Sequence, residues 1–282
     1  MDAQKLFLLL QVNDAAFPIG SYAHSLGLET YIRQGAVSDA ASAGAYICQN
    51  LRASFLYSEL LAAALAFDAA EAGNLGKALE LEDTLFASKS PSELRGAAAK
   101  LGSRFAKAAS VLTRAGDGAG ATASGATPEP AFGTIPAPAP AADDGVAAGE
   151  SAPPFSASDA ALAPNAGAHG SAIFGEYVAR AGKRVSHAVA YGVFCASLGI
   201  DRQSAMAAYL YAQAAAMATN CVKTIPLSQT DGQAILAGLR PLFGELLGAL
   251  AALGEDDLCR GAPGLDIASM QHERLYSRLY IS

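Results

Sequence analysis

The sequence predicts an all-α protein, a single-domain helical bundle that a disordered Ala/Gly/Pro-rich insertion interrupts. Three observations support this prediction. Hydrophobic residues make up 52% of the 282 residues and the mean hydropathy is +0.25, which is enough for a sizeable buried core. Most of these residues are Ala and Leu, and β-branched residues are sparse, which favours helices. The alternating pattern typical of strands is missing over any useful length.

Helix-end signals define the elements of the first half of the chain. After Gly35, an apolar-rich run predicts one long helix or two abutting helices, which begin at Ser38 or Asp39 and end at Gly73. The next helix is expected from Ser90 as the N-cap. Pro91 would take its first position and Glu93 would complete a capping box.

Four helices are predicted in the second half. The segment "VSHAVAYGVFCASLG" ends at Gly199, and Asp201 caps the next helix, which Pro226 ends. The segments "SQTDGQAILAGL" and "PLFGELLGALAALG" follow as shorter helices, the last of them opened by Pro241 and closed by Gly254.

The composition changes abruptly between Ala115 and Gly170. This segment holds 19 alanines, nine glycines and eight prolines, so we expect it to be a flexible low-complexity insertion. Residues 1–114 and 171–282 together would then form one helical domain. The insertion carries six of the 26 acidic residues and none of the 19 lysines and arginines. The rest of the chain is therefore nearly neutral, which argues against a nucleic-acid-binding surface.

The N-terminal segment and the cysteines indicate a cytoplasmic protein. Leu6 to Leu10 is an apolar run too short for a signal-peptide core. The four cysteines are far apart and form no C-x-x-C pair, so they predict neither a zinc site nor a disulfide framework. The segment from Gln203 to Val222 is uncharged and about long enough to span a membrane, but its polar residues favour a buried helix.

The stretch "FPIGSYAHSLGLETYIRQG" contains Ser21, His24 and Glu29, the residue types of a serine hydrolase. A nucleophile elbow needs G-x-S-x-G between a strand and a helix, and both the second glycine and the strands are missing. Ser21 is better explained as a helix cap. The sequence also lacks a phosphate-binding loop, and its histidines form no i,i+4 metal-binding pair. We therefore expect no catalytic activity, no catalytic residues and no stably bound metal or cofactor.

Three separated segments resemble the UreF family of urease accessory proteins. The opening stretch is similar to the family signature P-x-G-x-[FY]-x-x-S-x-G-L-E. A second similar segment runs from "HAVAYGVFCASLGI" to "TNCVKTIPLSQTDGQAIL", and the third is the tail "MQHERLYSRLYIS". Together with a weaker match around "AAAKLGSRFAKAA", the resemblance covers most of residues 6–113 and 171–282.

The resemblance implies an all-helical, homodimeric, non-enzymatic protein. It would act with UreD (also called UreH) and the GTPase UreG to promote nickel insertion into apo-urease. Nickel would be handled by the complex rather than held stably by this chain, and neither nucleic acid nor membrane would be a partner.

The resemblance also gives candidate site residues. We expect Glu29 on the exposed side of a helix, available to a partner, because a lone acid in an apolar helix usually faces solvent. Pro18 and Gly20 would fix a turn and Gly27 would allow close helix contact, and these three residues form a structural motif with Ser25. The alternative is that Pro18, Gly20, Gly27 and Glu29 serve only the core. Lys223, Gln229 and Asp231 surround the break at Pro226. They are either a recognition surface or, for Asp231 in particular, simple helix capping.

The tail from Met270 to Ser282 is predicted to be the main UreD contact and to be poorly ordered in the isolated chain. Its apolar and aromatic side chains have no following element to cover them, and Tyr and Arg often dominate protein interfaces. The alternative is that the tail folds back on its own core, with Arg278 binding the carbonyls of a helix end. The candidate contact residues of the tail are His272, Glu273, Tyr276, Ser277, Arg278 and Leu279.

Two other classes of protein stay open. A small-molecule-binding bundle would need a pocket among the helices that carry Tyr191, Tyr209 and Tyr211. A membrane-associated helical protein would partition into detergent. Neither class explains the three family-like segments.

Overall fold

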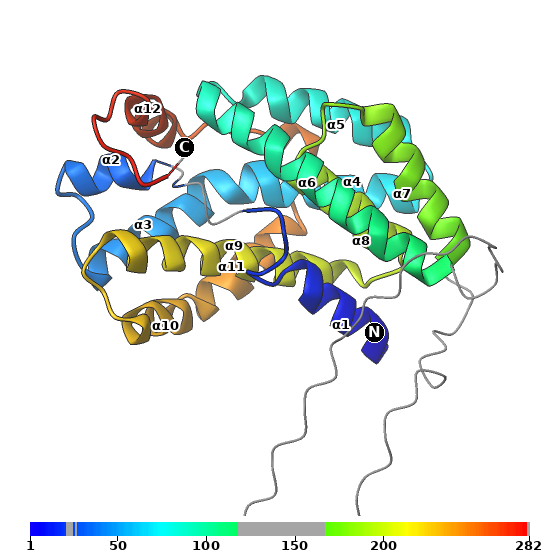
Figure 1. The fold of residues 1–282 in the computed structure, drawn as a ribbon, viewed down its shortest axis with the longest axis horizontal. Coiled ribbons are helices and arrows are strands. Elements are labelled where there is room, and N and C mark those ends of the chain that lie inside the picture. Colours follow the sequence, from blue (N-terminus) through cyan, green and yellow to red (C-terminus); the bar gives the residue numbers. More distant parts are fainter. Residues whose placement is uncertain (21–24, 26, 118–166, 281–282) are drawn as a thin grey trace, which may run out of the picture.

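The computed structural model describes residues 1–20, 25, 27–117 and 167–280, and these residues form an all-α protein (Figure 1). No strand occurs among them. The elements in chain order are α1 Ala3–Val12, α2 Leu28–Arg33, α3 Ala40–Asn50, the π-helical segment η2 Leu51–Leu60, α4 Leu61–Glu71, α5 Leu75–Ser88, α6 Ser92–Asp117, α7 Gly167–Ala181, α8 His187–Ser197, α9 Arg202–Thr224, α10 Gln229–Gly238, α11 Arg240–Leu250, the 3-10 turn η5 Glu255–Asp257 and α12 Pro263–His272.

Helices α4 and α8 form the centre of the bundle. Small residues allow their backbones to approach closely: Ala62, Ala63, Ala64 and Ala66 of α4 are fully buried. A Cβ atom placed on Gly192 of α8 would lie 2.2 Å from the Ala63 carbonyl oxygen, so only glycine fits this contact. The other helices surround this pair, with α5, α6 and α7 on one side and α1, α9 and α11 on the other (Figure 1).

An aromatic cluster fills the space beside the central pair. Phe105 of α6 contacts Tyr191 and Phe194 of α8, at ring-centroid distances of 6.0 and 5.7 Å. Tyr191 stacks on Tyr209 of α9 at 4.7 Å. These contacts join three helices through buried rings. Aromatic side chains bury more apolar surface than other side chains, so this cluster contributes strongly to the stability of the core.

Most predicted helix ends are confirmed. The side chain of Asp39 caps α3 by accepting from the backbone N of Ser42, and Asp201 caps α9 in the same way through Ser204. Gly73 and Gly199 follow α4 and α8 with positive φ angles. Helix α9 ends at Thr224, two residues before Pro226, because the residue before a proline avoids the helical conformation.

Some predictions at helix ends are wrong. Helix α6 begins at Ser92, and the carboxylate of Glu93 binds His272 and Arg278 of the tail instead of completing a capping box. Helix α11 ends at Leu250, before Gly254. The first helix of the opening stretch begins at Leu28, with Gly27 at the N-cap position, whereas Ser21 and His24 lie outside the described residues. Helices α1, α5, α7 and α12 have no counterpart among the predicted helices.

The helical run from α3 to α4 is continuous, which agrees with one long helix rather than two abutting helices. Its middle is π-helical. The segment η2 covers ten residues from Leu51 to Leu60. Long π-helical stretches are rare and often occur at functional sites. No residue pattern in the sequence indicates it.

The helices extend into both ends of the predicted insertion. Helix α6 continues to Asp117 and α7 begins at Gly167, so the boundaries at Ala115 and Gly170 were three to four residues too wide. The expected disorder falls on residues 118–166, which lie outside the described residues.

One described helical run, Ala40–Glu71, is long and apolar enough to cross a membrane, and 61% of its most apolar window is buried inside the protein. The run has the burial of a core helix. It differs from the candidate span considered in the sequence, Gln203 to Val222, which forms most of the buried helix α9.

Candidate functional site

The opening stretch and the C-terminal segment, about 240 residues apart in the sequence, lie side by side in space (Figure 1). Helix α2 packs on α12 through polar contacts. The Thr30 hydroxyl donates to the Ala268 carbonyl at 2.8 Å, and the Tyr31 hydroxyl donates to the Gly264 carbonyl at 3.1 Å. The Gln34 side chain also donates to that of Gln271 at 3.0 Å, so two of the three family-like segments meet at one site.

Gly27 confirms the predicted role of close helix contact. Its φ angle is +82°, in the left-handed region that favours glycine. A Cβ atom at this position would lie 3.2 Å from the Ser269 hydroxyl and 3.3 Å from the Cβ atom of Ala268. The start of α2 thus lies directly against α12.

Glu29 is buried, which corrects the expectation that it faces solvent. Only 7% of the residue is exposed. Its carboxylate accepts hydrogen bonds from the backbone N atoms of Leu279 at 2.8 Å and Tyr280 at 3.1 Å. A buried carboxylate needs such partners, and here the tail of the chain supplies them. The expectation that Glu29 faces solvent is wrong because its hydrogen-bond partners, Leu279 and Tyr280, lie about 250 residues away in the sequence and are brought to it only by the fold.

His272 connects Glu29 to Glu93. Its Nε2 atom is 2.7 Å from Oε2 of Glu29, and its Nδ1 atom is 2.7 Å from Oε2 of Glu93. The imidazole therefore bridges the two carboxyl groups, one through each ring nitrogen. Arg278 donates to the other oxygen of Glu93 at 2.6 Å.

We call this cluster of Glu29, Glu93, His272 and Arg278 the tail clasp. Three of its members were predicted site residues, while Glu93 was identified only as a helix-start residue. Its functional role was missed because the sequence places it in an apparent capping box, and only the fold brings it to the tail.

The described part of the tail, as far as Tyr280, folds back on the core, in agreement with the alternative considered for it. The Tyr280 hydroxyl donates to the Asn220 carbonyl of α9 at 3.3 Å, and the residue is 9% exposed. Arg278 does not bind the carbonyls of a helix end, as that alternative proposed, but the carboxylate of Glu93. No residue pattern in the sequence indicates the contact with Asn220.

Several apolar side chains of the same region point to solvent. Tyr276 is 100% exposed and Leu279 is 76% exposed, although the backbone N of Leu279 is bound to Glu29. On α12, Ile267 and Met270 are 53% and 42% exposed. We call these four residues the tail face. Exposed apolar side chains gathered on one segment mark interaction surfaces.

The remaining predicted contact residues lie on the surface. Glu273 accepts from the Ser92 hydroxyl at 2.5 Å, and Ser277 is exposed. Lys223 and Gln229 are exposed at the end of α9 and the start of α10. Asp231 forms a capping box with Ser228, which confirms the capping explanation for this residue.

The three other residues of the opening motif shape the approach to α2. Gly20 has a φ angle of +75°, which agrees with a turn after the exposed Pro18. The carbonyl of Ile19, between them, accepts from Arg104 of α6 at 3.2 Å. Ser25 is 3% exposed, and its carbonyl oxygen accepts from the Tyr46 hydroxyl at 3.3 Å.

Within the described residues, no group of three His, Cys, Asp or Glu side chains is placed to hold a metal ion. His187 lies among the rings of Phe105, Tyr191 and Tyr209. Burial lowers its pKa to about 4, so the ring is neutral at pH 7.

A small-molecule-binding bundle would need a pocket among the helices of Tyr191, Tyr209 and Tyr211, but these three described residues do not line a common pocket. Tyr209 lines a cavity, whereas Tyr191 is fully buried in the core and Tyr211 is 52% exposed.

Comparisons with known proteins agree with the motifs. The family model UreF matches residues 37–240, which is more than half of the chain. The chain belongs to the UreF family. The curated relatives of this UreF family member include "Urease accessory protein UreF" of Bacillus sp. (strain TB-90), 30% identical over 99% of both chains. Proteins of the same name from Actinobacillus pleuropneumoniae serotype 3 (strain JL03) and Arthrobacter sp. (strain FB24) are 29% and 28% identical. The first alignment covers 99% of both chains, and the second covers 97% of this chain and 96% of the relative.

The name that these relatives carry is that of an accessory protein and not of an enzyme. This UreF family member is accordingly an accessory protein and not an enzyme. The family model matches residues 37–240. The tail clasp therefore joins Glu29, in the opening motif before the matched region, to His272, which lies after it.

Proposed function

We propose that this protein acts in urease maturation by binding UreD (UreH) through its tail face. Together with the GTPase UreG it would promote the delivery of nickel, the cargo, to apo-urease. The full-length similarity to urease accessory proteins supports the process. The single structural observation that carries the contact is the tail face itself, with Tyr276 100% exposed beside a clasped backbone.

The tail clasp gives this surface its shape. Glu29 holds the backbone at Leu279 and Tyr280, and Arg278 is held by Glu93. The Leu279 side chain is therefore presented by a fixed backbone, three residues after Tyr276, and this part of the tail loses less conformational entropy on binding. Tyrosine is one of the residue types that most often dominate interface hot spots.

The exposed surface around Lys223 and Gln229 lies next to the tail, at the same end of the molecule. The tail is bound to Asn220, one turn before the end of α9 at Thr224. We propose this exposed region, with Glu273 and Ser277, as a second contact area within the complex. The protein would work in the cytoplasm as a homodimer, as the family resemblance implies.

The experiment is co-expression of UreD, UreG and apo-urease with and without this chain, followed by urease activity and bound nickel. The chain carrying Tyr276→Ser and Leu279→Ser should fail to co-purify with UreD and should give little active urease. Both side chains are exposed, so the melting temperature should stay within about 2 °C of the wild-type value.

The matched control is Val111→Ser, which changes an exposed apolar residue of α6, 64% exposed, away from the tail face. Unchanged UreD co-purification by the tail-face variant would refute the contact. Full urease activation without this chain would refute the function.

A further inference from the structure

The outer face of α6 carries a compact group of basic side chains. Lys100, Arg104 and Lys107 are spaced by four and three residues, so they lie on one face of the helix, and all three are exposed. Helix α6 lies on the outside of the bundle (Figure 1). We call these three residues the basic stripe. Apart from Glu93 and Asp117, near its two ends, α6 contains no acidic residue.

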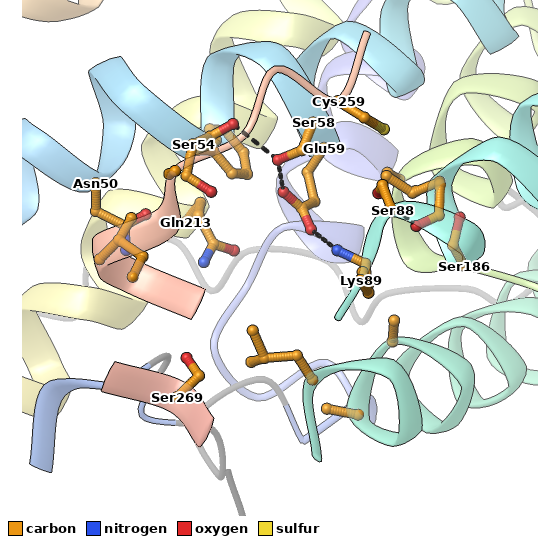
Figure 2. Close-up of a pocket in the computed structure, with 18 of the residues that line it drawn as sticks. Asn50, Ser54, Ser58, Glu59, Ser88, Lys89, Ser186, Gln213, Cys259 and Ser269 are labelled. Carbon is orange, nitrogen blue, oxygen red and sulfur yellow. Dashed lines mark hydrogen bonds and ion pairs between the residues drawn. The ribbon is translucent and has the colours of Figure 1, made fainter. Parts of the chain in front are cut away.

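The basic stripe forms no ion pair with an acidic side chain of the described residues. Other basic residues do, as Lys89 pairs with Glu59 (Figure 2) and Arg202 with Asp68. Helix α6 contains five basic and two acidic residues, so its formal charge is +3 in a chain of −7. The stripe is therefore a local positive surface on an acidic protein.

The opening motif holds Arg104, the central side chain of the stripe. Nη1 of Arg104 donates to the Ile19 carbonyl at 3.2 Å. A Cβ atom on Gly20 would lie 2.7 Å from the same Nη1 atom, so the guanidinium lies directly against the backbone of the turn, in space that a side chain would occupy. A guanidinium has five N–H groups, and this contact uses one of them. The turn at Pro18 to Gly20 therefore orients a side chain whose other donors suit a planar acceptor such as a carboxylate.

The size of the stripe suits an acidic protein segment. From Lys100 to Lys107 the helix rises about 10 Å, and the stripe places three cations along this length. Side chains at i,i+3 and i,i+4 positions are about 5–6 Å apart, so carboxylates at a similar spacing in a partner can pair with all three. Nucleic acid fits less well, because its binding depends on many phosphate contacts and the net negative charge of this chain repels it.

We propose that the basic stripe binds an acidic segment of a partner protein. Arg104, held by the opening motif, binds one carboxylate with two parallel N–H groups. Lys100 and Lys107 pair with carboxylates about one turn to either side. The stripe shares no residue with the tail face, and the proposal does not depend on the contact proposed there.

The test is a fluorescence-anisotropy titration of the full chain into labelled hexaglutamate at about 10 mM ionic strength, where charge screening is weak. Labelled hexaglutamine is the uncharged probe and labelled hexathymidylate is the nucleic-acid probe. Hexaglutamate should bind with a Kd below about 1 mM. Hexaglutamine should not bind, and hexathymidylate should bind more weakly than hexaglutamate.

Two variants of the basic stripe locate the contact. Lys100→Gln with Lys107→Gln leaves the bond between Arg104 and Ile19 in place and should weaken hexaglutamate binding about fivefold. The triple variant that adds Arg104→Gln should weaken it at least about tenfold. The three side chains are exposed, so the melting temperature should stay within about 2 °C of the wild-type value.

The matched control changes three exposed basic residues at the end of α7, by Arg180→Gln, Lys183→Gln and Arg184→Gln. It removes the same charge as the triple variant of α6, so general electrostatic attraction would respond equally to both. The control should change hexaglutamate binding by less than about twofold. Four outcomes would overturn the proposal: no binding of hexaglutamate, unchanged binding by the α6 variants, an equal loss in the control, or hexathymidylate binding as tight as that of hexaglutamate or tighter.

Discussion

Glu82 is the most deeply buried carboxylate of the described residues, with 2% exposure. Its Oε1 and Oε2 atoms accept from the backbone N of Ser186 at 2.9 and 3.0 Å, and the Tyr177 hydroxyl also donates to it. It thus joins α5 to the start of α8 and to α7. Burial raises the pKa of Glu82 to about 7, because these hydrogen bonds do not fully replace the lost hydration.

This raised pKa predicts a pH-dependent stability. The usual value is 4.5, so between pH 4.5 and about 7 the folded state binds more protons than the unfolded state. The free energy of unfolding contributed by Glu82 is therefore highest below pH 4.5 and falls by about 3 kcal/mol as pH rises to about 7. Glu82→Gln cannot ionise. Its stability relative to wild type should rise by about 3 kcal/mol between pH 5 and 8.

Denaturant unfolding of both proteins across this pH range measures the difference. His187 has the opposite slope, since its lowered folded pKa destabilises the protein as pH falls below 6.5. It is present in both proteins, so its contribution cancels. A difference between variant and wild type that stays constant with pH would contradict the assignment.

At the scale of elements, the tail clasp holds a segment that has no helix of its own after His272. The hydrogen bonds to Glu29, the ion pair of Arg278 with Glu93 and the hydrogen bond from the Tyr280 hydroxyl to the Asn220 carbonyl hold residues 278–280. Glu29 accepts three hydrogen bonds, two of them from the tail backbone. The docking of the tail therefore depends more on this one side chain than on any tail residue.

Glu29→Gln should release the tail while leaving the core folded. The amide presents an N–H group where the clasp needs an acceptor, so at least one tail hydrogen bond is lost. Trypsin should cleave after Arg274 and Arg278 at least about tenfold faster, which corresponds to about 1.4 kcal/mol of docking free energy. Mass spectrometry of early fragments measures these rates.

The control for this variant is Glu176→Gln, which removes only an exposed ion pair with Arg180 and should change neither rate. If Glu29→Gln left the cleavage rates at their wild-type values, the clasp would not be what holds the tail.

At the scale of the whole molecule, the helical domain is made from two halves of the sequence. Helices α6 and α7 pack against each other on the two sides of the insertion, and α8 from the second half packs on α4 from the first. The core is shared, so neither half has a complete hydrophobic interior of its own. The composition of residues 118–166 gives them few side chains with which to contribute to it.

Replacing residues 118–166 by a flexible linker of about ten residues should therefore leave the helicity and the melting temperature nearly unchanged. Circular dichroism measures both. The replacement removes five acidic residues and no basic ones, so the formal net charge changes from −7 to −2, and elution from an anion exchanger should occur at lower salt. In the wild-type chain, limited proteolysis should cut this segment first. A large fall in melting temperature would mean that the segment packs on the core.

The sequence determined the class of fold and many helix ends, because these depend on local chemistry. Asp39, Asp201 and Ser228 cap helices through their own side chains, and Pro226 ends one whatever surrounds it. The family was also readable from motifs, since their order and spacing are properties of the chain itself.

The tertiary structure decided which polar residues are buried and what they bind. Glu29 was expected in solvent and Glu93 in a capping box, yet both bind His272, because helices far apart in the sequence meet there. The cavity that Tyr209 lines likewise has walls from several helices, which only the fold brings together. Local sequence rules predict how a backbone segment satisfies its own hydrogen bonds. They cannot predict a carboxylate whose partners lie 250 residues away, because only the folded core brings those partners within 3 Å.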